Sequence, residues 1–102
     1  MDFAIIWEFR VRSGREQAFE AAYGAKGDWV TLFRKSPEYV RTELIRDLNS
    51  RGRYLTIDVW TSGAAYESFR ESYRVEYKKI DALCAEMTEA ERAVGKFAGV
   101  GG

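Results

Sequence analysis

The stretch Arg53–Phe69, RYLTIDVWTSGAAYESF, changes its hydrophobic period near its middle and so predicts where a strand ends and a helix begins. Residues Arg53–Trp60 alternate between two sets of side chains, and a period of two is typical of a β-strand. From Ser62 onward the apolar residues follow a helical spacing. Trp60 lies at this junction, where it either fills a core or forms the wall of a site.

Further strands are predicted on both sides of this junction. Phe3–Arg12 alternates with a period of two, and Tyr39–Leu48 contains a second strand. The turn residues Asn49–Gly52 join that strand to Arg53–Trp60, so the two are expected to form a hairpin. A last strand is expected at 94–100, although it contains two glycines, which weaken a strand interior.

Three helical segments are predicted between the strands. Ser13 is expected to cap a helix that ends at Gly24, and Asp28 is expected to cap a short helix that ends before Pro37. The segment after Ser62 is expected to form a long helix, and the sequence TEAE at 88–91 resembles a capping box that starts one more helical turn. One face of the long helix is expected to carry Tyr73, Tyr77, Ile80, Cys84 and Met87.

This order of elements predicts a ferredoxin-like α+β fold in one domain over residues 1–102. Right-handed crossovers place the helices on one face of a four-stranded antiparallel sheet, in which the first and third strands are central. Both central strands carry apolar residues on both faces, whereas the helices cover only one face. The other face therefore predicts a homodimer, with an interface formed by Ala4, Ile6, Leu55, Ile57 and Val59.

Composition argues against several classes of partner. Sixteen basic residues balance sixteen acidic ones, and no basic run is longer than Lys78-Lys79, so nucleic acid is not an expected partner. The longest apolar run, Phe3–Trp7, is far shorter than the roughly 20 residues of a membrane helix, and the N-terminus has no recognisable leader. A single cysteine, Cys84, cannot form an internal disulfide. We therefore expect a cytoplasmic protein that does not associate with membranes.

No cofactor or metal is expected from sequence motifs. The chain contains no histidine, which excludes serine–histidine triads and the common zinc sites. Metal-binding motifs such as HExxH, CxxC or an EF-hand loop are missing, as are the glycine-rich loops that bind NAD, flavin or ATP. Cys84 lies in the apolar stripe of the predicted long helix, which indicates a buried, unreactive thiol.

Two segments carry a resemblance to a known family. The segment FRVRSGREQAFEAAY, residues 9–23, has a strand with alternating hydrophobic and basic residues, a glycine and a helix with a phenylalanine; Arg53–Phe69 has a strand, a tryptophan and a helix with an alanine–aromatic pair. Over nearly its full length the chain resembles the antibiotic biosynthesis monooxygenase family of dimeric α+β barrel proteins. The resemblance implies a homodimer whose sheets pack face to face, with a small-molecule cavity between each sheet and its own helices.

The resemblance does not by itself choose a reaction. The family includes cofactor-independent oxygenases of aromatic polyketides and oxygenases that degrade haem, so a shared fold is weak evidence for either. Haem-degrading relatives bind iron through a histidine on the helix after the tryptophan, where this chain has Tyr66, Phe69 and Arg70. They also have an asparagine at the position of Trp7. Haem degradation is therefore not expected.

The third strand carries the candidate site. Trp60 matches the family tryptophan that lines the cavity, and its face also carries Tyr54, Thr56 and Asp58. Buried polar groups need partners or water, which suits a cavity wall better than a dry core. Alternatively, Trp60 is a core residue and Asp58 pairs with a helix arginine. Tyr66 lies six residues after Trp60, where polyketide-oxidising relatives have a similar tyrosine, although the tyrosines of this helix also fit a core.

These residues predict a cofactor-free monooxygenase that oxidises a small or polycyclic aromatic with O2. Asp58 and Tyr66 are the candidate catalytic residues, with Asp58 as proton acceptor, because a deprotonated electron-rich ring can pass an electron to O2 unaided. Catalysis of this kind would need a cavity of roughly 300 Å³ that reaches Trp60. The alternative is a non-catalytic binding or structural dimeric module, in which Trp60 is packed tightly. The expected substrate-binding residues are Trp60, Trp7, Thr56 and Phe19.

Overall fold

A computed structural model describes residues 2–101 and contains the predicted ferredoxin-like α+β sheet. Neighbouring strands are all antiparallel, in the order β2-β3-β1-β4, so the first and third strands are central. Trp7 faces Thr56 across the central pair, and Ile5 faces Asp58. The prediction of the fold class is confirmed. The strands are β1 (Phe3–Val11), β2 (Tyr39–Arg46), β3 (Arg53–Trp60) and β4 (Thr88–Ala98).

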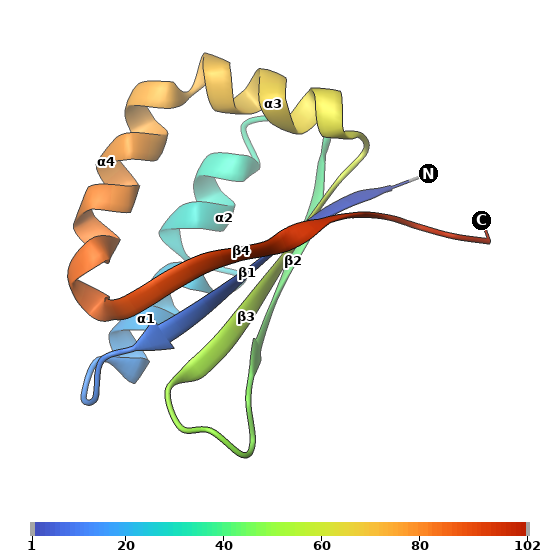
Figure 1. The fold of residues 1–102 in the computed structure, drawn as a ribbon. Helices are drawn as coiled ribbons and strands as arrows, with labels where there is room; N and C mark the ends of the chain where they lie inside the picture. Colours follow the sequence, from blue (N-terminus) through green and yellow to red (C-terminus); the bar gives the residue numbers. More distant parts are fainter. Residues whose placement is uncertain (1, 102) are drawn as a thin grey trace.

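The helices cover one face of this sheet, as predicted (Figure 1). Figure 1 shows α3 and α4 meeting at a bend on one side of the sheet, with α1 and α2 on the same side. The helices are α1 (Glu16–Tyr23), α2 (Asp28–Phe33), α3 (Gly63–Ser72) and α4 (Arg74–Cys84), and a single 3₁₀ turn η1 (Ala85–Met87) leads into β4.

An aromatic core fills the space between the sheet and the helices. Phe19 of α1 and Trp60 of β3 are its largest fully enclosed side chains, each with 0% of its surface exposed. Trp60 packs edge-on against Phe33, Tyr39 and Tyr66, with ring centroids 5.3–5.5 Å apart. Large aromatic rings packed in this way bury a large apolar area per residue.

The long helix predicted after Ser62 is broken at Tyr73. Its start is as expected, because the Ser62 hydroxyl accepts a hydrogen bond from the Ala65 amide at 3.0 Å. Tyr73, however, has φ −114° and ψ 30°, so α3 ends before it and α4 begins after it. The break turns the chain so that α4 runs back along the sheet. Arg70 at the end of α3 and Tyr77 at the start of α4 then face the same space.

The first two helices begin at different residues from those predicted. Ser13 does not cap α1, because Gly14 turns the chain with φ +88° and the helix begins at Glu16. The Glu16 carboxylate instead accepts a hydrogen bond from the Gly14 amide at 2.8 Å. Asp28 is the first residue of α2, and Gly27 occupies its cap position.

The last strand is longer than predicted, and the prediction of a helical capping box at Thr88–Glu91 is wrong. These residues instead begin β4, and the whole of β4 pairs with β1 from Val11↔Thr88 to Phe3↔Ala98. The local helix signal is overridden because the free edge of a central strand needs partners for its N–H and C=O groups. The correction matters for the site, since Glu91 pairs with Phe9 on the helix-covered side.

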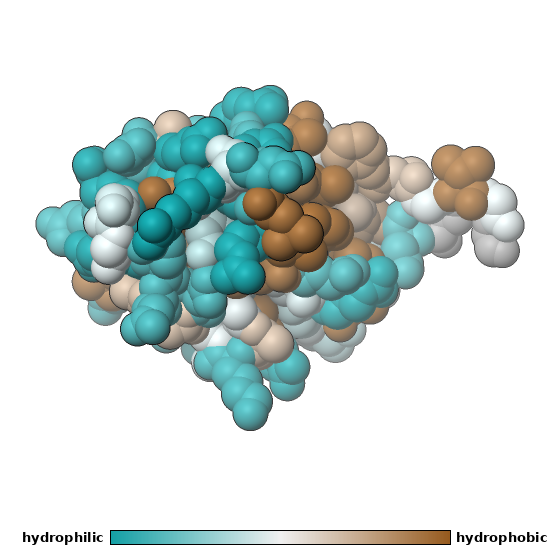
Figure 2. Space-filling view, turned by 90° about the horizontal axis from the view of Figure 1, so that it is seen from below, coloured by the Kyte–Doolittle hydropathy of each residue, from teal (hydrophilic) through white to brown (hydrophobic). Residues whose placement is uncertain are grey.

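The opposite face of the sheet carries apolar side chains that no helix covers. Figure 2 shows the molecule from this side, with hydrophobic atoms gathered near the centre among hydrophilic ones. Glu8 at its border forms ion pairs with Arg53 and Arg92. Val59 is an exception among the predicted interface residues, because it is already buried within the chain and presents little surface. The strand pairing places Ala4, Ile6, Ile45, Leu55, Ile57 and Phe97 on this face.

Gly27 joins α1 to α2 at a tightly packed corner, so a substitution there tests the packing. A methyl group there would lie 2.3 Å and 2.4 Å from the carbonyl oxygens of Ala22 and Ala21, so the backbone would have to shift. We expect Gly27→Ala to lower the free energy of unfolding by about 2–3 kcal/mol, as overpacking typically does. Urea denaturation measures the change. Gly99→Ala, where a methyl group meets nothing within 4 Å, is the control, and equal losses in both variants would contradict the packing argument.

Candidate functional site

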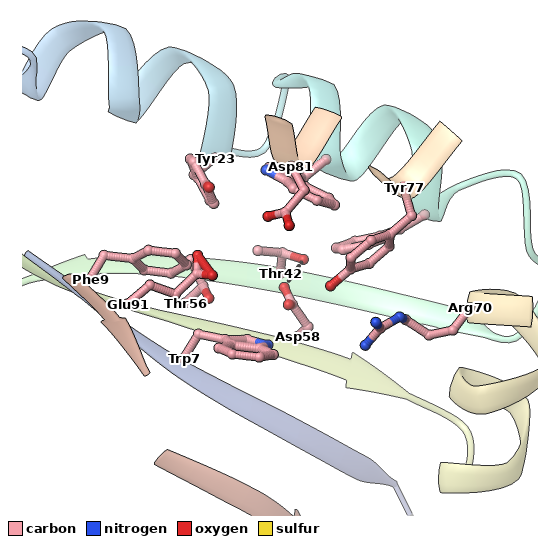
Figure 3. A pocket seen from close by; sticks show the side chains of 12 residues that line it. Trp7, Phe9, Tyr23, Thr42, Thr56, Asp58, Arg70, Tyr77, Asp81 and Glu91 are labelled. Carbon is pink, nitrogen blue, oxygen red and sulfur yellow. Dashed lines mark hydrogen bonds between the residues drawn. The ribbon is translucent and has the colours of Figure 1, made fainter. Parts of the chain in front are cut away.

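A cavity of about 130 Å³ lies between the sheet and the helices and is partly open to solvent (Figure 3). It is smaller than expected from the sequence, but its size matches a single aromatic ring, since an engineered cavity of about 150 Å³ binds benzene. Every strand and every α-helix contributes to its wall. The lining residues are Trp7, Phe9, Tyr23, Trp29, Phe33, Thr42, Thr56, Asp58, Arg70, Tyr77, Asp81 and Glu91.

Asp58 is the buried acid on the sheet side of the cavity. Only 7% of the residue is exposed, and its Oδ1 accepts a hydrogen bond from Thr42 Oγ1 at 2.7 Å. The Thr42 hydroxyl in turn accepts one from the Tyr39 hydroxyl at 2.8 Å. Among residues 2–101, no arginine or lysine forms an ion pair with Asp58. The alternative interpretation, a salt bridge to a helix arginine, is therefore not what the structure shows.

Burial raises the pKa of Asp58 from 3.8 to about 6, and the hydrogen bond from Thr42 opposes this rise. Desolvation disfavours the charged carboxylate, and one hydroxyl donor compensates only in part. The side chain is therefore mainly ionised at pH 7 but accepts a proton readily. A carboxylate with these properties beside a cavity is suited to general acid–base chemistry.

Arg70 and two tyrosines form the polar group at the other side of the cavity. The Arg70 Nη1 donates a hydrogen bond to the Tyr66 hydroxyl at 3.1 Å, and the guanidinium lies 4.2 Å from the centre of the Tyr77 ring. In Figure 3 the guanidinium and the Tyr77 hydroxyl both point toward Asp58. Burial raises the pKa of Tyr77, so its hydroxyl stays protonated and can donate a hydrogen bond.

Two carboxylates from different elements complete the lining, Asp81 of α4 and Glu91 of β4. The pKa of Glu91 is raised, first by burial and second by the negative charge of Asp81. Two acidic groups in one wall favour neutral or cationic ligands over anions.

Three of the predicted site residues lie at the cavity: Trp7 and the β3 residues Thr56 and Asp58. Their placement follows from the strand period, because Trp7 and Thr56 are paired neighbours on the helix-covered face.

The other three predicted residues lie behind the cavity wall. Trp60 is separated from the cavity by Phe33, which lines it and packs against the Trp60 ring. Phe19 stacks on Tyr23, a lining residue, with ring centroids 4.2 Å apart. Tyr66 does not line the cavity, but its hydroxyl accepts a hydrogen bond from Arg70, which does. Trp60 is thus packed tightly, which is the arrangement expected of the non-catalytic alternative.

Sequence reasoning missed most of the polar groups at the cavity, among them Thr42, Arg70, Tyr77, Asp81 and Glu91. Thr42 could have been found, because the hairpin register places it opposite Asp58 on the same face. Glu91 was hidden by the incorrect capping box. Arg70 and Tyr77 carry no local signal, because they come together only through the break at Tyr73.

Neither a metal site nor a membrane helix is found in the part of the chain that the structure describes. No group of three or more cysteine, aspartate or glutamate side chains among residues 2–101 is arranged to hold a metal ion. The helices of the same residues are too short and too polar to cross a bilayer.

Comparison with known proteins identifies relatives of this fold. A family model described as antibiotic biosynthesis monooxygenase matches residues 2–92. A structure of a SnoaB variant, a cofactor-independent oxygenase from Streptomyces nogalater, has a TM-score of 0.72 and 19% identity, covering 97% of this chain and 93% of that one. A candidate antibiotic biosynthesis monooxygenase from Bordetella bronchiseptica has a TM-score of 0.76 and 19% identity, covering 97% of both chains. No curated protein matches the sequence.

The raised pKa of Asp58 predicts a stability cost that depends on pH. Between pH 3.8 and about 6 the folded chain binds a proton at Asp58 that the unfolded chain has lost, so stability falls as the pH rises through this window. Asp58→Asn removes that cost. We expect it to raise the free energy of unfolding by up to about 3 kcal/mol at pH 8 and by little at pH 4.

Urea denaturation at the two pH values measures this difference. Asp47→Asn is the control of opposite sign, because the Asn49 amide and Arg53 lower the pKa of Asp47. That variant should lose stability at pH 8. If Asp58→Asn is no more stable at pH 8 than the wild type, burial of the charged Asp58 carboxylate does not lower the free energy of unfolding.

Proposed function

The chain belongs to the antibiotic biosynthesis monooxygenase family, and from this premise we propose that it is a cofactor-independent monooxygenase of an aromatic substrate. The observation that carries the proposal is Asp58, a carboxylate that is 7% exposed, lies at an aromatic cavity and has no cationic partner within residues 2–101. A buried unpaired acid is costly for stability, and such groups occur mainly where they act on a ligand. The similarity in fold to a cofactor-independent oxygenase supports the same reaction class.

The proposed substrate is a phenol or an anthrone-type ring. The cavity holds one ring among Trp7, Phe9 and Phe33, and any further rings extend through its open side. Asp58 takes a proton from the ring and leaves a resonance-stabilised anion. The Thr42 and Tyr39 hydroxyls hold the Asp58 carboxylate in a hydrogen-bonded chain that reaches the half-exposed Tyr39 side chain.

The anion then reacts with O2 without a metal or flavin. Electron transfer from the ring carbon reduces O2, and the new C–O bond gives a peroxide that takes the proton back from Asp58. For a CH2 group, loss of water from the hydroperoxide leaves a carbonyl, so one oxygen atom enters the product and the other leaves in water. The protein supplies a proton acceptor and a dry aromatic wall for this sequence. In this scheme Trp60 and Phe19 pack behind the residues that line the cavity and keep them in position. Thr56 offers a hydroxyl to the substrate.

A non-catalytic binding module remains the second candidate, and the tight packing of Trp60 favours it. Such a module would bind the aromatic ligand in the same cavity and release it unchanged. The two candidates differ in whether O2 is consumed.

Oxygen uptake with anthrone and with a panel of phenols tests the enzymatic proposal. Wild type should accelerate uptake above the spontaneous rate, with kcat/KM decreasing below about pH 6 as Asp58 becomes protonated. Asp58→Asn should lower kcat by about 10²–10⁴-fold, the usual contribution of a general base. Asp2→Asn, an exposed carboxylate outside the cavity, is the matched control. Saturable binding with no oxygen uptake would identify the module instead.

We also propose that two copies associate through the uncovered sheet face. Ile57 lies on the central strand β3 of this face, and Ile45 of β2 and Phe97 of β4 on the same face are 44% and 47% exposed in the single chain. Ile57→Glu should convert the dimer to a monomer, because an unpaired charge would be buried at the interface. Light scattering at micromolar concentration measures the mass. Val75→Glu, at an exposed position of α4, should leave the dimer intact. A monomeric wild type would contradict the association.

A further inference from the structure

Arg70 has hydrogen-bonding capacity that the protein does not use. Its guanidinium lines the cavity, yet it donates only one side-chain hydrogen bond among the described residues, to Tyr66. None of the ion pairs within residues 2–101 includes it. Glu67, an acid of the same helix, pairs with Lys96 instead. A guanidinium carries five N–H donors, and in a partly dry cavity these bind anionic oxygens strongly.

The guanidinium is held in place by two contacts. The Tyr77 ring lies under it at 4.2 Å, and the Tyr66 hydroxyl accepts from its Nη1 at 3.1 Å. Stacking and a hydrogen bond together restrict a long side chain that would otherwise be mobile. A donor fixed in this way binds a ligand at a lower entropic cost than a free one. Figure 3 shows the guanidinium directed inward from the end of α3.

We propose that Arg70 and Tyr77 bind an anionic oxygen of an aromatic ligand, and that Tyr66 positions the guanidinium. The Tyr77 hydroxyl lines the same cavity and offers a second donor to that oxygen. The inference rests on the proposed function and deepens it. It identifies the residues that bind the oxygen of the substrate on which negative charge collects after Asp58 has removed the proton. Asp58 and Arg70 form no ion pair with each other, so the ligand lies between a proton acceptor and an anion site.

The surrounding charges favour a ligand that enters neutral and ionises inside. Asp58, Asp81 and Glu91 all line the cavity, whereas Arg70 is its one cationic lining residue among those described. A carboxylate ligand carries its charge throughout entry and meets repulsion from these acids. A phenol or an enolisable ketone enters without charge and becomes an anion beside Arg70. The ligand class is therefore a phenolate or enolate.

Binding of 4-nitrophenol under anaerobic conditions tests the site without turnover. Its phenolate absorbs visible light, so one titration reports both affinity and the ionisation of the bound ligand. Wild type should lower the pKa of bound 4-nitrophenol, because a cation stabilises the phenolate. Arg70→Gln should abolish that shift and weaken phenolate binding about 10- to 100-fold, the range for hydrogen bonds to charged groups. Arg74→Gln, which removes an arginine paired with Glu71 outside the cavity, should change neither.

Further arms separate anion binding from a merely structural role. Binding of 4-nitroanisole, which cannot ionise, should be unchanged in Arg70→Gln, and Arg70→Lys should restore part of the pKa shift. Tyr77→Phe and Tyr66→Phe should each reduce the shift without removing it. Equal loss of 4-nitroanisole and 4-nitrophenol binding would overturn the proposal, as would failure of wild type to bind 4-nitrophenol. Tighter binding of 4-nitrobenzoate would overturn the phenolate assignment. Because no oxygen is consumed, this result is independent of the oxygenase test.

Discussion

The antiparallel pairing of β1 with β3 is the constraint on which the rest of the structure depends. This register places Trp7 beside Thr56 and Ile5 beside Asp58 on the face that the helices cover. Because successive side chains of a strand point to opposite faces, the same register places Ile6 and Ile57 together on the uncovered face. A slip of one residue would exchange the two faces, and would move the acid to the surface and the apolar residues into the core. One set of hydrogen bonds therefore fixes both the cavity and the apolar face.

The cavity is built at a cost to stability. Asp58 is held in a desolvated position with a hydroxyl as its donor, and the indole N–H groups of Trp29 and Trp60 are buried without an acceptor among residues 2–101. Buried polar groups with incomplete hydrogen bonding destabilise a fold. A sequence selected for stability alone would place an apolar residue at position 58. The retained acid is more readily understood as a group that acts on a ligand.

Charge is separated across the cavity. The acid Asp58 lies on the sheet, and the cation Arg70 lies at the end of α3. An ion pair between the two would have neutralised both and occupied the space between them. Instead each is held by hydroxyl groups, Asp58 by Thr42 and Arg70 by Tyr66, so that a ring can lie between them. The arrangement uses short polar contacts to orient side chains and leaves their reactive atoms free.

Local sequence patterns determined the first three strands and the face on which each of their residues lies, because the period of two follows from backbone geometry alone. They therefore predicted the fold class and the helix-covered face on which Trp7, Thr56 and Asp58 lie, and the hairpin register would have added Thr42. The tertiary structure decided what depends on packing between distant segments. Pairing with β1 turned a local helix signal at Thr88 into a strand, and the break at Tyr73 brought Arg70 to the cavity. Phe33 came to lie between Trp60 and the cavity, because side-chain packing, which no local pattern encodes, decides which aromatic residue lines a space.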